Sequence, residues 1–159
     1  MSRLVALTAL VLVTAACGST DTGSSGTGSS PSPSVSSTPA ASPTKPPLVF
    51  PLNGLGTTAK GTITVTTGPA TLTVELKITG LQPKSSHINH IHVGTCTARG
   101  GIKFALNQVV ADGQGDADII TTVKATYPPP TGKWYVVVHA GPDMNGTNSK
   151  YLLCGNLFK

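Results

Sequence analysis

The sequence predicts an all-β domain, folded as an antiparallel β-sandwich or flattened barrel of seven to eight short strands. Three observations support this fold class: apolar and polar residues alternate along several short stretches, Gly- and Pro-rich breaks separate the stretches, and charged residues are scarce. Only 11% of the 159 residues are charged, whereas 18 are Gly and 13 are Pro. This composition argues against a coiled coil or a helical bundle.

The clearest strand covers residues 71–79, where every second residue is apolar: Leu72, Val74, Leu76 and Ile78. Such alternation predicts a strand with one buried face and one solvent-exposed face. Residues 62–66 alternate in the same way, and the turn-forming segment 67–70 joins the two stretches.

Five further stretches have strand-like composition, at residues 88–93, 103–110, 117–123, 134–139 and 151–158. Breaks are expected at residues 99–101, 112–115, 128–130 and 141–146. No helix is predicted.

The N-terminal residues 1–16 have the form of an export signal. Arg3 precedes an apolar run at 4–13, which is too short to span a membrane that needs about 20 apolar residues. Small residues directly before Cys17 resemble the lipobox of bacterial lipoproteins, which implies acylation of Cys17 and anchoring at the extracytoplasmic face of a bacterial cell membrane. The alternative is a plain secretory signal with an incidental Cys.

A polar segment follows, so that residues 17–47 are expected to form a lipidated Cys and a disordered tether. Residues 18–47 contain ten Ser, five Thr, six Pro and four Gly, and such a composition buries too little apolar surface to offset its ordering entropy. Residues 48–159 then form the folded domain.

All four histidines of the chain fall into two places. His90 and His92 lie two residues apart in a predicted strand, so their imidazoles point to the same face. His139 ends another predicted strand and could join them, whereas His87 has the opposite parity to His90. Three imidazoles from two strands suit copper or zinc. The alternative is surface or hydrogen-bonded histidines without a metal.

The order of motifs resembles the copper/zinc superoxide dismutase family. The matching segments are the His-rich stretch 87–96, the strand end 136–139, the final stretch 152–155 and the turn 111–117. The resemblance implies a Greek-key, immunoglobulin-like β-barrel of the superoxide dismutase type, and copper ligation by His90, His92 and His139. It also implies a supporting role for His87 and a disulfide between Cys96 and Cys154, the alternative being two buried free thiols.

Several family features are absent. No bridging His follows Cys96, and the loop that supplies zinc ligands is missing, so copper is the expected metal and zinc is not. Tyr151 occupies the position of the family's active-site Arg, which leaves Lys150 or Arg99 to guide an anion electrostatically. No catalytic residue is assigned.

Two functions remain in view. The first is a lipid-anchored, copper-dependent domain that dismutates superoxide. The second is a non-catalytic metal-binding or structural lipoprotein, because part of the chain is also similar to the related chordin-type (CHRD) domain. The net charge is +5, but the basic residues are scattered singly, so a nucleic-acid partner is not expected. Oligomeric state is left open.

Overall fold

The computed structural model describes residues 45–159, which contain ten β-strands and one 3₁₀ turn. The strands are β1 (Leu48–Gly54), β2 (Lys60–Thr67), β3 (Leu72–Thr79), β4 (Ser86–His87), β5 (Asn89–Gly94), β6 (Arg99–Ala105), β7 (Val109–Val110), β8 (Ala117–Val123), β9 (Trp134–His139) and β10 (Tyr151–Asn156), with η1 (Gly146–Ser149) before the last. Within residues 45–159 no helix has the length and apolar character needed to cross a membrane.

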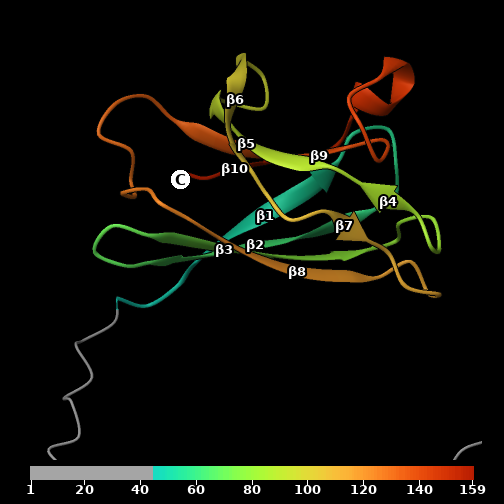
Figure 1. The fold of residues 1–159 in the computed structure, drawn as a ribbon, viewed down its shortest axis with the longest axis horizontal. Coiled ribbons are helices and arrows are strands. Elements are labelled where there is room, and N and C mark those ends of the chain that lie inside the picture. The colour runs from blue at the N-terminus through green and yellow to red at the C-terminus, as the bar shows by residue number, and fades with distance from the viewer. Residues whose placement is uncertain (1–44) are drawn as a thin grey trace, which may run out of the picture. The chain divides into compact units, whose positions relative to one another are not determined.

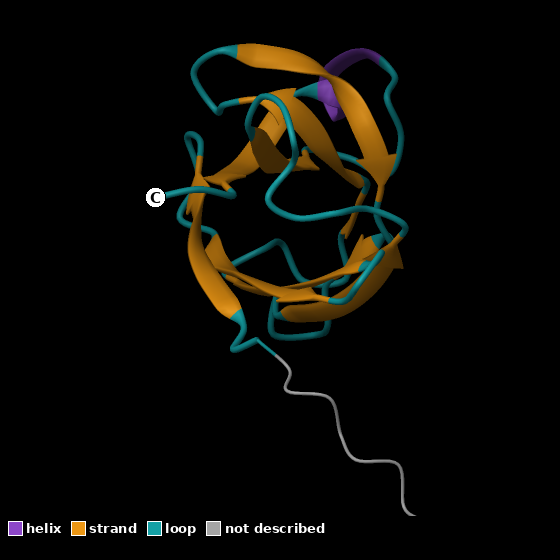
Figure 2. Cartoon of the chain, turned by 90° about the vertical axis from the view of Figure 1, so that its left-hand side faces the viewer, coloured by secondary structure: helices purple, strands orange, loops and turns teal. Residues whose placement is uncertain are grey.

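Eight of these strands form one curled antiparallel sheet, in the order β6-β5-β9-β10-β1-β2-β3-β8 (Figure 1). The two remaining strands, β4 and β7, pair with each other. Seen from the side, the strands surround a common interior (Figure 2). The predicted all-β class and flattened-barrel architecture are confirmed.

The interior is filled by alternate residues of the strands. In β3 the four apolar residues predicted to face inward are each at most 1% exposed, and in β2 Ile63 and Val65 are buried beside them. Burying a side chain of this kind stabilises the fold by roughly 1.5–3 kcal/mol. The period-two pattern therefore identifies the core face of both strands correctly.

Three details of the sequence-based prediction are wrong. Strand β1 was not predicted, because Pro51 interrupts its apolar run and Pro is rare inside sheets. Pro51 is tolerated because β1 pairs with β2 along Leu48–Leu52 but with β10 only at Asn53 and Gly54.

The other two errors concern predicted breaks. Strand β6 begins at Arg99 and runs through the two glycines that were expected to break the chain. A short 3₁₀ turn at residues 146–149 begins at the last residue of the expected break 141–146, where no helix was predicted.

Asn107, in the connection after β6, forms hydrogen bonds to both β5 and the edge strand β8. Its Nδ2 donates to the Ile120 carbonyl at 2.7 Å, and its amide donates to Oγ1 of Thr121 at 2.8 Å. Its own carbonyl accepts a hydrogen bond from Nδ2 of buried Asn89 at 2.6 Å. Asn107 thereby links β5 to the free edge of β8.

Strand β10 contains an irregularity where it meets β9. Tyr151 lies opposite His139 and Leu153 lies opposite Val138, so Leu152 has no partner in the register. Such a β-bulge reverses the alternation of the strand. Tyr151 consequently faces the same side as His139, whereas strict alternation would have placed it with the core residue Leu153.

Candidate metal centre

Three histidines meet on one face of the sheet. His90 and His92 project from the same face of β5, which pairs with β9, and His139 is the last residue of β9. The ring centroids are 5.9 Å apart for His90 and His92, 5.2 Å for His90 and His139, and 6.0 Å for His92 and His139. One ring nitrogen of each residue lies within 4.8 Å of the other two.

The nitrogens that face one another have no hydrogen-bond partner. Nδ1 of His92 donates to the Gly100 carbonyl at 3.0 Å, and Nδ1 of His139 donates to the Ser149 carbonyl at 2.8 Å. Because a carbonyl only accepts, the proton of each neutral ring is on Nδ1 and Nε2 keeps a free lone pair. Both Nε2 atoms and Nδ1 of His90 are buried without a partner. Three buried, unsatisfied acceptors that converge on one point fit a metal ion.

The surroundings of His90 and His139 favour the neutral form of these two rings. Burial, with smaller contributions from His139 and His92, lowers the pKa of His90 to about 4. Burial also lowers the pKa of His139, although the hydrogen bond to Ser149 acts in the opposite direction. Neutral imidazole is the form that binds metals, so these shifts favour metal binding at pH 7.

His87 supports the cluster from behind. It belongs to the short strand β4, is 4% exposed, and donates from Nδ1 to the main-chain carbonyl of His139 at 2.9 Å. Its Nε2 lies 2.8 Å from Oγ of Ser85. The structure thus places His87 next to a proposed ligand and outside the cluster itself, in agreement with its strand parity.

Two tyrosines lie against the cluster. The ring of Tyr135 is 5.2 Å from that of His92, and the ring of Tyr151 is 5.4 Å from that of His139. The two hydroxyl groups are 3.1 Å apart. Burial, followed by the hydrogen bond to Tyr135, raises the pKa of Tyr151 to about 12, so it is a neutral phenol at pH 7.

Of the two cations considered from the sequence, Arg99 is connected to the cluster through an aromatic ring. Its guanidinium carbon lies 4.2 Å from the centroid of the Tyr151 ring. Lys150 is exposed, and its main-chain carbonyl accepts a hydrogen bond from the Ala140 amide. The sequence did not single out Tyr135, although it stands directly opposite His92 in the register.

A disulfide joins Cys96, in the turn after β5, to Cys154 in β10, with the Cα atoms 5.9 Å apart. The Cys96 amide also donates to Oδ1 of Asn156 at 2.9 Å. These contacts fix the turn between the strand that carries His92 and strand β6. Cys17, the signal 1–16 and most of the segment 17–47 lie outside the described residues.

Within residues 45–159, His90, His92 and His139 form the one group of three or more His, Cys, Asp or Glu side chains close enough to share a metal ion. The chain has four His, and all four are accounted for by the cluster and by His87. Strand β6 begins only three residues after Cys96. This short connection leaves no room for a zinc-binding loop.

Residues 41–144 match the family model of the CHRD domain. The chain belongs to the CHRD domain family. This match spans His87, His90, His92 and His139 and ends before Tyr151 and Cys154. No curated protein matches the chain.

Solved structures similar to this CHRD domain are superoxide dismutase-like. A SOD-like protein from Bacillus subtilis is 16% identical, with a TM-score of 0.54 over 69% of this chain and 97% of that chain. A double mutant of a SOD-like protein from Bacillus subtilis, in which a Tyr and a Pro are each replaced by His, is 18% identical, with a TM-score of 0.55 over 70% and 97%. At this level of identity the similarity establishes a shared fold, and the two resemblances seen in the sequence are both confirmed.

Proposed function

We propose that this CHRD domain binds one copper ion through His90, His92 and His139. The observation that carries the proposal is the set of three buried ring nitrogens that face one another without a hydrogen-bond partner. An all-imidazole donor set suits Cu(II), which binds nitrogen ligands more tightly than Zn(II) does. The hydrogen bonds from Nδ1 of His92 and His139 to carbonyls orient both rings and raise the basicity of the ligating atoms.

Metal analysis tests this function directly. The protein is produced in medium containing equal concentrations of copper and zinc, and the bound metals are counted by mass spectrometry. We expect one copper per chain and little zinc. His92→Gln should lose the stoichiometric copper, whereas Lys84→Gln, an exposed change away from the cluster, should retain it. Full copper occupancy in a variant with all three histidines replaced would overturn the site.

Superoxide dismutation is the second candidate function. Bound copper would supply the one-electron exchange that this reaction needs, and the SOD-like fold of the structural neighbours supports it. The chain's own contribution would be Arg99, whose positive charge attracts an anion toward the cluster. Against rapid turnover, the sequence has no further His to deliver protons, and Tyr151 is a weak acid.

An assay on the copper-loaded protein separates these two functions. Dismutation well above that of the same concentration of free copper chelate, and lost in His92→Gln, would identify an enzyme. Stoichiometric copper with a rate no higher than that of the chelate would identify a non-catalytic copper-binding domain.

We also propose that the chain is exported and anchored by a lipid on Cys17, at the extracytoplasmic face of a bacterial cell membrane. The apolar run 4–13 and the small residues before Cys17 support this localisation. Metabolic labelling with a fatty acid tests it. The native chain should incorporate the label and fractionate with membranes, and Cys17→Ser should do neither. A native chain that is secreted without the label would show that residues 1–16 are a plain secretory signal.

A further inference from the structure

Charge is distributed unevenly over residues 45–159. All Lys and Arg residues of the chain except Arg3, and all Asp and Glu residues except Asp21, lie in this part. Among these residues, the ion pairs both involve Lys77, with Glu75 at 2.7 Å and Asp118 at 2.8 Å. The other lysines are therefore free to interact with charges outside the domain.

Five of these lysines gather at one end. One groove of about 530 Å³ is lined by Lys103 and Lys124 together with Trp134 and Pro128–Pro130. A second groove of about 300 Å³ is lined by Lys45 and Lys159, and shares Pro128 with the first. The ammonium group of Lys133 lies 4.3 Å from the ring centroid of Phe158, which also lines the second groove. We call this surface the basic end, defined by Lys45, Lys103, Lys124, Lys133 and Lys159.

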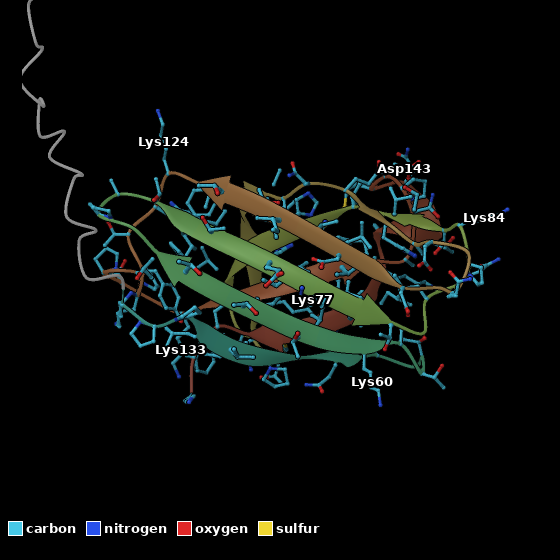
Figure 3. The ribbon with its side chains drawn as sticks, turned by 90° about the horizontal axis from the view of Figure 1, so that it is seen from below. Lys60, Lys77, Lys84, Lys124, Lys133 and Asp143 are labelled. Atoms are coloured by element: carbon cyan, nitrogen blue, oxygen red, sulfur yellow. A yellow bond between two sulfur atoms is a disulfide. The ribbon has the colours of Figure 1, made fainter. Side chains whose placement is uncertain are left out.

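No Asp or Glu side chain lines either of these grooves of the described domain. The aspartates lie elsewhere. Asp112, Asp116 and Asp118 line a groove of about 730 Å³ together with Lys60 and Lys77. Figure 3 shows Lys124 and Lys133 at one end of the domain, and Lys60, Lys84 and Asp143 at the other. The domain is thus polarised, with mixed charges at one end and only positive side chains in the grooves of the other.

The basic end is also where the chain enters the domain. Lys45 lies three residues before the start of β1 and itself lines the second groove. The preceding sequence leads back to Cys17. A lipid on that residue would place the membrane on the N-terminal side of the chain, although the inference below also holds for a chain without the lipid.

We propose that the basic end docks on the anionic phospholipid headgroups of a membrane surface. Each Lys close to such a surface contributes about 1 kcal/mol of attraction, which falls off over a Debye length of roughly 10 Å at 0.1 M salt. Several lysines on one end, without neighbouring carboxylates, meet this requirement, whereas the mixed charges at the opposite end do not. The apolar walls formed by Pro128–Pro130 and Phe158 suit the boundary between headgroups and water.

This docking sets how far each histidine lies from the membrane. Strand β9 starts at Trp134, in a groove of the basic end, and finishes at His139. Five steps of about 3.3 Å place His139 roughly 16 Å from that end along the strand. His92 stands opposite Tyr135, one residue from Trp134, so the docked domain holds His139 farther from the lipid than His92.

Vesicle binding tests the proposal with the metal-free chain from residue 18 onward, which lacks the lipid. It should sediment with vesicles of equal parts phosphatidylglycerol and phosphatidylcholine at low salt. It should not sediment with phosphatidylcholine alone, and added salt should release it. The variant Lys103→Gln, Lys124→Gln, Lys133→Gln should bind roughly 100-fold more weakly, from three losses of about 1 kcal/mol each. The matched control Lys60→Gln, Lys84→Gln, Lys150→Gln removes the same charge and should change binding only a few-fold.

Four results would overturn the proposal. These are equal losses in the two triple variants, equal binding to both kinds of vesicle, no binding to either, or binding to soluble polyphosphate with none to vesicles. None of them bears on copper binding or on the lipidation of Cys17, because the experiment uses neither. Circular dichroism of both variants shows that they remain folded.

Discussion

The guanidinium of Arg99 stacks on the ring of Tyr151, with 4.2 Å between its central carbon and the ring centroid. Tyr151 in turn contacts the histidine cluster, at 5.4 Å from the ring of His139 and 5.8 Å from that of His92. A positive charge therefore lies one aromatic ring away from the proposed ligands. It comes from Arg99, the first residue of β6.

Replacing Arg99 should slow the reaction of the copper-loaded protein with superoxide. Steering by a single charge near a site acts on the encounter rate and weakens with ionic strength. We expect Arg99→Gln to lower the rate constant about tenfold or less at low salt, and to flatten its salt dependence. Lys103→Gln, on the same strand, serves as the control. Pulse radiolysis at two ionic strengths measures the rate constant and its salt dependence for each protein. Identical salt dependences of Arg99→Gln and the native protein would exclude the steering role.

The hydroxyl of Tyr135 should matter for metal affinity. The Gly100 amide donates to this hydroxyl at 3.3 Å, while the Gly100 carbonyl holds Nδ1 of His92. Tyr135→Phe removes one anchor of Gly100, at a cost of about 1 kcal/mol, and should weaken copper binding several-fold in a chelator competition. Tyr127→Phe is a matched control, because its hydroxyl donates to the Leu157 carbonyl away from the cluster. Equal copper affinities of Tyr135→Phe and Tyr127→Phe would show that the position of Gly100 does not depend on the Tyr135 hydroxyl.

The sequence was sufficient to predict the core strands and the meeting of three histidines. Both predictions depend on alternation, which holds along β3 and between His90 and His92. The contribution of Tyr151 could not be predicted in this way. Its parity assigns it to the core side with Leu153, and only the bulge at Leu152 turns it toward His139. A bulge depends on the partner strand, so it leaves no local pattern in the sequence.

Strand β1 and the first part of β6 were missed for a similar reason. Pro51 and the pair Gly100-Gly101 normally interrupt strands, but here the neighbouring strands determine the outcome. Gly100 also lies against Val93, where a Cβ atom would come within 2.2 Å of the Val93 carbonyl oxygen. Glycine at this position therefore allows close packing of β5 and β6 and does not break the strand.

Loss of the disulfide should destabilise the domain. Cys96 and Cys154 are 58 residues apart, and closing a loop of that length restricts the unfolded chain by about 4 kcal/mol. Cys96→Ser with Cys154→Ser should lower the urea midpoint, and reduction of the native protein should lower it similarly. The double variant provides the control, since a reductant should have no further effect on it. Alkylation of two thiols in the unreduced native protein would contradict the bond.

The metal-free protein should lose stability as the pH falls from about 6.5 towards 4. In the unfolded chain His90 titrates near its ordinary pKa of about 6.5, whereas burial lowers the pKa in the folded state to about 4. Between these values the unfolded state binds a proton that the folded state does not, so unfolding becomes more favourable at lower pH. Urea midpoints at pH 7 and pH 5 measure the effect.

The variant His90→Gln checks the origin of this pH dependence. It lacks the titrating group, so its urea midpoint should change less between pH 7 and pH 5 than that of the native protein. His139, whose pKa is also lowered by burial, remains in the variant and should preserve part of the slope. An unchanged slope in His90→Gln would assign the pH dependence to other groups.

The first and last strands of the domain, β1 and β10, are neighbours in the sheet. The curled sheet therefore cannot be completed until its C-terminal strand has been synthesised, and pairing between such distant segments is slow to form. His139 depends on this closing step, because β10 pairs with its strand and Ser149 orients its ring. A nascent chain carries His90 and His92 long before it can offer the third imidazole. The order of biogenesis is thus built into the topology: β5 and β9 are available to pair first, but the ring of His139 gains its orienting contact only after Ser149 has been synthesised.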